Sequence, residues 1–146
     1  MTRTFTLSEA EALLPHLDRL LATVIKGRQR LGELETMHEA ILARIMVLGG
    51  VQLDPLQLAE GKRLRNDLGG AVSHAMEEIA GLGVQVKDLE TGLLDFPSLR
   101  DGRVVLLCWR RGETHIAHWH GTDEGYAQRK PITPDHDASA GGKSVQ

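Results

Sequence analysis

Hydrophobic residues recur every three or four positions through the first half of the chain. From Leu17 they keep a heptad register for more than four repeats, and only Gly27 and His38 depart from apolar character. A repeat of this period is typical of an α-helix that packs one face against another helix. The register consists of Leu17, Leu20, Val24, Gly27, Leu31, Leu34, His38, Ile41, Ile45 and Leu48.

The ends of the first helix carry recognisable signals. Ser8 with Glu11 three residues later forms a capping-box pattern that opens a helix. Pro15 suits the first position of a new helix or a kink. We therefore predict a first helix over residues 8–48, with a break near residue 15.

A second helix is predicted over residues 54–82. The pair Gly49-Gly50 ends the first helix, and Asp54 followed by Pro55 is the pattern of an N-cap and first helical residue. The two helices make a coiled-coil-like antiparallel hairpin. Because two helices leave one side of each apolar seam exposed to water, we expect a second copy to complete a four-helix bundle as a homodimer.

Beyond residue 83 the period changes to that of β-strands, over residues 84–120. If Arg111-Gly112 is a two-residue hairpin turn, Cys108 lies opposite His115. One predicted face then holds Val105, Leu107, Trp109, Ile116, His118 and His120, and the other holds Val104, Leu106, Cys108, His115, Ala117 and Trp119.

These patterns predict an α+β protein in which a long helical hairpin precedes a small antiparallel β-sheet. We expect residues 1–132 to form a single domain, with residues 121–132 as a turn and terminal segment. Residues 133–146 are rich in Pro, Gly, Ser and Asp without periodicity, so we expect a disordered tail.

Composition narrows the range of partners. The chain has 146 residues, 25% of them charged, and a formal net charge of -3 without a basic block, which argues against nucleic acid. The longest apolar run, "VVLLCW", is too short to span a membrane. A single cysteine, Cys108, and the lack of a secretory signal pattern at the start lead us to expect a cytoplasmic protein.

Three stretches resemble a known family: "FTLSEAEALLPHL", "GVQVKDLETGLLDFPSLRDGRVVLLCWRRGE" and "HWHGTDEGYAQRKPI". They are similar to a small bacterial family catalogued as domain of unknown function 2203, and the likeness runs from Phe5 to about Ile132. No catalytic residue, cofactor or partner is established for that family, so the resemblance implies no reaction. The likeness centres on Asp95, Phe96, Asp101, Cys108, Trp109, Glu113, Trp119, His120 and Arg129.

The clearest candidate chemistry is in "HWHGTDEG". His118 and His120 project from one face of a strand, and Asp123 or Glu124 follows closely. Two imidazoles and a carboxylate suit a divalent transition metal such as zinc or iron. The rival interpretation is structural: an acidic neighbour holds His120, while Asp123 and Glu124 accept hydrogen bonds from backbone amides of a turn.

Other residues support weaker hypotheses. Cys108 opposite His115 could be an activated thiol, although a buried structural cysteine is the commoner case. Trp109 or Trp119 could stack a ligand beside neighbouring arginines, and Arg129 is a further candidate. Asp95 in "DFPS" and Asp101 in "RDGR" have turn roles that suffice to explain them.

No motif specifies a reaction, and the catalytic residues, if any, remain unknown. The heptad register favours a non-enzymatic interaction or assembly module that dimerises through its helices and could bind a further protein partner. The alternative is a transition-metal-binding protein or metalloenzyme with its site at the end of the last strand.

Overall fold

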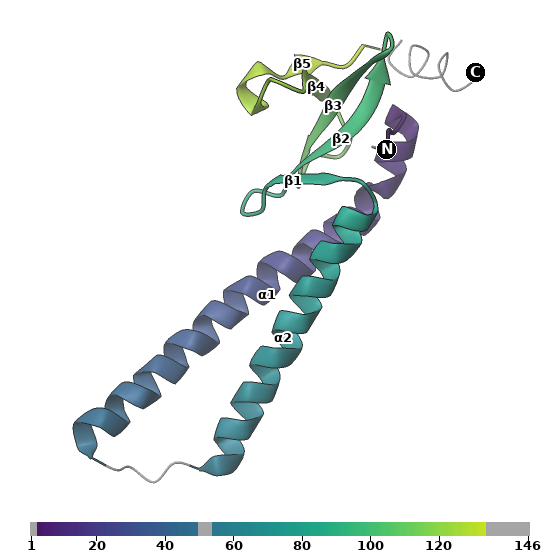
Figure 1. The fold of residues 1–146 in the computed structure, drawn as a ribbon. Coiled ribbons are helices and arrows are strands. Elements are labelled where there is room, and N and C mark those ends of the chain that lie inside the picture. The colour runs from purple at the N-terminus through teal and green to yellow at the C-terminus, as the bar shows by residue number, and fades with distance from the viewer. Residues whose placement is uncertain (1–2, 50–53, 134–146) are drawn as a thin grey trace. The chain divides into compact units, whose positions relative to one another are not determined.

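A computed structural model describes residues 3–49 and 54–133, which have the predicted α+β architecture (Figure 1). The described residues belong to two compact units: residues up to Leu21 with those from Glu77 onward, and residues Ala22–Met76. No helix in the described part of the chain is both long enough and apolar enough to span a membrane. The elements are α1 (Leu7–Leu48), α2 (Pro55–Gly81), β1 (Gln85–Asp88), β2 (Leu93–Arg100), β3 (Arg103–Arg110), β4 (His118–Gly121), η1 (Tyr126–Gln128) and β5 (Lys130–Pro131).

Helix α1 starts with a capping box, but not the predicted one. The Glu9 amide donates to Thr6 Oγ1 at 3.1 Å, and the Thr6 amide donates to Glu9 Oε1 at 2.8 Å. The box therefore lies two residues before the predicted Ser8 and Glu11. Glu11 instead reaches the sheet, where its Oε2 accepts a hydrogen bond from the Ile116 amide at 3.0 Å.

The predicted break near residue 15 is absent, because α1 continues as a helix through Pro15. Proline removes one backbone hydrogen bond from a helix interior. Leu14 and Leu17 on either side are buried, and packing of an apolar face contributes more to helix stability in proteins than intrinsic propensity does. Burial of the neighbouring leucines therefore explains why the helix is not interrupted.

Helix α2 begins as predicted. Asp54 Oδ1 accepts a hydrogen bond from the Leu56 amide at 2.9 Å, which makes Asp54 the N-cap and Pro55 the first helical residue. The helix ends at Gly81, one residue before the predicted boundary. The helical hairpin is thus confirmed.

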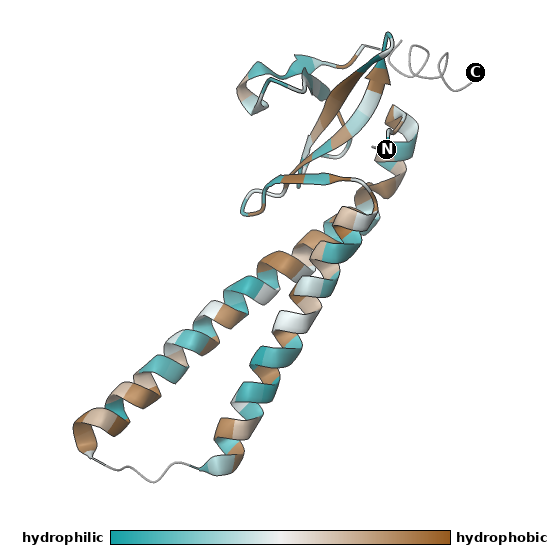
Figure 2. Cartoon of the chain, viewed as in Figure 1, coloured by the Kyte–Doolittle hydropathy of each residue, from teal (hydrophilic) through white to brown (hydrophobic). Residues whose placement is uncertain are grey.

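The apolar seam of the hairpin is filled along only part of its length. In the unit Ala22–Met76, Val24 and Leu34 are buried, whereas Ile41 and Leu48 are 39% and 60% exposed. Figure 2 shows hydrophobic residues continuing to the end of α1 that adjoins the connection to α2. The heptad pattern is therefore longer than the helix-helix contact that it makes within one chain.

The sheet is fully antiparallel, with strand order β1-β2-β3-β4-β5. Asp101 and Gly102 have φ angles of 50° and 80°, as a two-residue hairpin turn between β2 and β3 requires. The start of the chain is bound to β2: the Phe5 amide donates to the Pro97 carbonyl at 2.7 Å, and Ser98 Oγ donates to the Phe5 carbonyl at 2.6 Å. Residues 94–98 of β2 are buried on both faces of the sheet.

The predicted register between β3 and the last long strand is wrong. The turn at Arg111-Gly112 exists, since the Glu113 amide donates to the Arg110 carbonyl at 3.0 Å. The strand does not resume there, because residues 113–117 are irregular and β4 starts at His118. Cys108 consequently pairs with His118 instead of His115.

This shift in register exchanges the two faces of the sheet on which the β4 side chains lie. Residues 115 and 118 differ by an odd number of positions, and an odd shift moves every side chain to the other side of the sheet. His118 and His120 therefore share a face with Leu106 and Cys108, instead of the predicted Leu107 and Trp109. Trp119 lies on the face opposite His118 and His120, as predicted.

The segment after β4 is more regular than the predicted turn and terminal segment. It contains η1 and the short strand β5, which pairs with β4 through His118 and Trp119. The predicted disordered tail lies outside the described residues, apart from exposed Thr133.

Gly27 allows the two helices of the hairpin to approach each other. A Cβ atom built on Gly27 would lie 2.5 Å from Val72 Cγ2, whereas one on Gly32 would meet nothing within 4 Å. We expect Gly27→Ala to destabilise the protein by about 1–3 kcal/mol through overpacking, reduced by up to about 1 kcal/mol from alanine's better helix propensity. Gly32→Ala is the matched control, and it should be stabilising. Urea unfolding of both variants tests this expectation, and equal effects would contradict it.

Candidate functional site

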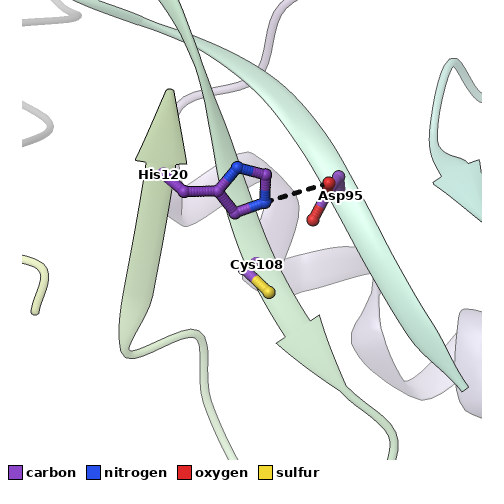
Figure 3. A group of neighbouring side chains, drawn as sticks. All are labelled: Asp95, Cys108 and His120. Atoms are coloured by element: carbon purple, nitrogen blue, oxygen red, sulfur yellow. Dashed lines mark ion pairs between the residues drawn. The ribbon is translucent and has the colours of Figure 1, made fainter. Parts of the chain in front are cut away.

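Three side chains that can ligate metals gather inside the sheet: Asp95, Cys108 and His120 (Figure 3). Asp95 on β2 pairs with Cys108 on β3, so both project from the same face. His120 on β4 lies two residues from His118, the partner of Cys108, and so shares that face. All three are buried, and one potential ligand atom from each lies within 4.8 Å of the others.

The orientation of the His120 ring is fixed by a backbone group. Its Nδ1 lies 2.8 Å from the Gly121 carbonyl oxygen, and because a carbonyl only accepts, Nδ1 carries a hydrogen. The other nitrogen, Nε2, is 3.1 Å from Asp95 Oδ2. Although that distance is short, neither Asp95 oxygen accepts a hydrogen bond of good geometry within the described residues. The two side chains are therefore in close polar contact without a well-aligned hydrogen bond.

Burial controls the ionisation of Asp95. Removal from water raises the pKa of its carboxyl group, and the adjacent His120 only partly opposes this effect. The ionised form of Asp95 therefore depends on a neighbouring positive charge.

Cys108 lies in an environment that keeps its thiol protonated. Burial, and then the charge of Asp95, raise the pKa of Cys108 to about 12, while nearby Arg129 opposes the shift. His115, the expected activating partner, is exposed, and its Nδ1 is 3.1 Å from Thr114 Oγ1. The structure thus does not bring together the pair required for an activated thiol, and Cys108 is the buried cysteine of the alternative interpretation.

Two of the four predicted metal ligands lie in a turn beside the cluster. Glu124 Oε1 accepts hydrogen bonds from the Gly121 amide at 2.7 Å and from Lys130 Nζ at 2.5 Å. These contacts, Lys130 first, lower the pKa of Glu124. Asp123 is exposed next to Gly121. The role of Glu124 is therefore the one expected from the structural interpretation.

His118 and His120 have different surroundings despite sharing a face. His118 is partly exposed, and its buried Nδ1 has no hydrogen-bond partner in the described part of the chain. Within residues 3–49 and 54–133, the only group of three or more potential ligands contains His120 but not His118, Asp123 or Glu124. The residues expected as metal ligands, His118 and His120 with Asp123 or Glu124, therefore do not form one cluster among the described residues.

The remaining candidates make structural contacts. Trp109 is buried, and its Nε1 donates to the Glu113 carbonyl at 2.9 Å. Trp119 is partly exposed, with Arg100 and Lys130 at 5.0 and 4.7 Å from its ring centroid. Arg129 Nη2 donates to the Tyr126 hydroxyl at 2.9 Å, and its Nη1 lies 3.7 Å from Glu113 Oε2.

Sequence reasoning missed Asp95, which it assigned to a turn. The residue lies within β2, where it interrupts the apolar run from Leu93 to Phe96. An acidic residue inside a buried strand requires a partner, and that requirement was the available signal. Its partner lies 25 positions along the chain, and identifying it required the register of two strand pairs.

Comparison with known proteins places the chain in a family. A family model described as "Uncharacterized conserved protein (DUF2203)" matches residues 3–132. The chain belongs to the DUF2203 family. A search of curated proteins and a search of solved structures each returned no match. Membership of DUF2203 confirms the resemblance seen in the sequence and leaves the function open.

Removal of the His120 imidazole should leave the buried Asp95 carboxyl group of this DUF2203 protein without a polar neighbour. We expect His120→Ala to destabilise the metal-free protein by about 1–3 kcal/mol, because the buried Asp95 carboxyl group loses its polar neighbour. Adding Asp95→Asn to His120→Ala should recover much of that loss. Urea unfolding in the presence of a chelator measures both effects, and no recovery in the double variant would contradict this account.

Cys108 should be unreactive in the folded protein. Its burial and its raised pKa, about 12, leave almost no accessible thiolate at pH 8. We expect a chromogenic disulfide reagent to label it only at the rate of unfolding, and to label it rapidly in denaturant. Fast, stoichiometric labelling under native conditions would restore the activated-thiol hypothesis.

Proposed function

We propose that this DUF2203 protein is an assembly module that forms a homodimer through the distal arm, defined as residues 37–49 and 54–64 of the helical hairpin. Eight of the ten large hydrophobic side chains exposed in the described residues belong to this arm. They are Met37, Ile41, Leu42, Met46, Val47, Leu48, Leu56 and Leu64. This concentration of exposed apolar side chains is the observation that carries the proposal.

The distal arm is unusual for a surface of an isolated chain. Met46 and Val47 are 85% and 82% exposed, although both helices of the hairpin are present. Burying apolar surface contributes about 25 cal/mol per Å², and extended exposed apolar patches commonly mark interaction sites. The arm therefore has a strong driving force for association.

A second copy of the same chain is the occupant that fits best. Ile41 and Leu48 continue the heptad register that is buried at Val24 and Leu34, and Met37 lies beside it, four residues before Ile41. A hairpin with such a face can pair with an identical hairpin as a four-helix bundle, with the coiled-coil packing expected from the sequence. The proposal assigns no reaction to the protein, and it places the dimer in the reducing cytoplasm that its lone thiol suits.

Charge placed on the distal arm should separate the subunits. The double variant Ile41→Glu/Leu48→Glu changes exposed positions of that face, so each hairpin should still fold while the interface acquires unpaired charges. We expect a dimer for the wild type and a monomer for the variant in light scattering, with unchanged helical circular dichroism.

The matched control is Gln29→Glu, an exposed position of the same helix outside the arm, which should remain dimeric. A wild type that is monomeric at high concentration would refute the proposal. A dimer that persists in the double variant would place the interface elsewhere and refute the assignment to the arm.

A further inference from the structure

Several polar atoms around Cys108 are buried without the partners that such atoms require. Neither carboxylate oxygen of Asp95 has a hydrogen bond of good geometry among the described residues, although His120 and Cys108 lie beside it. Arg129 Nη1 likewise has only the Glu113 carboxylate, at 3.7 Å. Such groups are normally paired in folded proteins, because leaving one unsatisfied costs about 1–3 kcal/mol. Their concentration at one place indicates that something more belongs there.

The geometry of His120 specifies the charge of the missing component. Because Nδ1–H faces the Gly121 carbonyl, Nε2 of a neutral ring would direct a lone pair toward Asp95 Oδ2, 3.1 Å away. Two acceptors at that distance repel each other unless a proton or a metal cation lies between them. A proton would serve at most one oxygen of Asp95, and the contact lacks the alignment of a hydrogen bond.

We propose that Asp95, Cys108 and His120 bind a divalent transition-metal ion of the zinc class. They offer a carboxylate oxygen, a sulfur and an imidazole nitrogen, three ligand types that zinc accepts. Bond lengths of roughly 2.0–2.3 Å place tetrahedral ligands roughly 3.5 Å apart, so atoms within 4.8 Å need only a small inward movement.

The surroundings of the cluster match those of known metal ligands. A metal-bound histidine typically donates its other ring nitrogen to a carbonyl or carboxylate, as His120 Nδ1 does to Gly121. The thiolate of Cys108 distinguishes the site from one for magnesium or calcium, which prefer oxygen ligands. Binding releases the thiol proton of Cys108 to solvent.

The charges balance when the ion is bound. The carboxylate of Asp95 and the thiolate of Cys108 neutralise the two positive charges of the ion, and His120 is neutral. Arg129 lies near Cys108 and is itself paired with Glu113. A metal thiolate would also supply an acceptor close to Arg129, whose Nη1 has only the long contact with Glu113.

This site differs from the ligand set expected from the sequence, and also from the proposed dimer interface. Only His120 is common to both ligand sets, since the expected one used His118 with Asp123 or Glu124. Substitutions at Cys108 and Asp123 therefore distinguish the two. Because all three proposed ligands are buried, the ion should enter as the chain folds and leave slowly.

The experiment uses the full chain without an affinity tag, refolded with Co²⁺ or Zn²⁺ as the sole added metal. Co²⁺ bound to Cys108 should produce a thiolate-to-metal charge-transfer band, and elemental analysis after gel filtration should find about one ion per chain. Cys108→Ser should abolish the band, and Asp95→Asn should lower the affinity at least tenfold. Asp123→Asn and His115→Gln should leave both the band and the stoichiometry unchanged.

Folding of each variant in chelator is checked by circular dichroism. A folded wild type without stoichiometric metal would overturn the proposal. Bound Co²⁺ without a thiolate band, or binding that Asp123→Asn removes while Cys108→Ser does not, would also overturn it. If Cys108→Ser does not fold, the folded Asp95→Asn variant decides the question. A lower affinity of that variant for Co²⁺ supports the site, and an unchanged affinity refutes it.

Discussion

The pairing of β4 with β3 is the constraint on which the interior of the sheet depends. It places His120 Nε2 3.1 Å from Asp95 Oδ2, two strands away, and thereby gives a buried carboxyl group a polar neighbour. A buried acidic group without such a partner destabilises a fold by several kcal/mol. A register shifted by one residue would direct His120 into the opposite face and leave Asp95 without this neighbour.

The irregular segment 113–117 is what allows this register. It adds residues between the turn and β4, and it is anchored at both ends: Trp109 donates to the Glu113 carbonyl, and the Ile116 amide donates to Glu11. Glu11 belongs to the first turns of α1, so the start of the helix supports the strand that carries His120. This anchoring links the helical and β-sheet parts of the compact unit that contains the site.

The two proposals concern separate units and different physical forces. The distal arm is an exposed apolar surface, for which the driving force is release of water from side chains such as Met46 and Val47. The cluster around Cys108 is a buried polar group whose stability depends on charge compensation. A DUF2203 protein could therefore assemble through one unit whether or not the other binds metal.

Local patterns in the sequence determined the helices, the Asp54 N-cap, the Asp101-Gly102 turn and the shared face of His118 and His120, because each depends on residues close together in the chain. They could not determine which residues face His120 across the sheet. That depends on how many residues between Arg110 and His118 make no strand pairing. A hydrogen bond to Glu11, about a hundred positions earlier in the chain, helps to hold that segment in place. Only the tertiary structure therefore separated Cys108 from His115 and joined it to His120, because an odd shift in register exchanges the two faces of a strand.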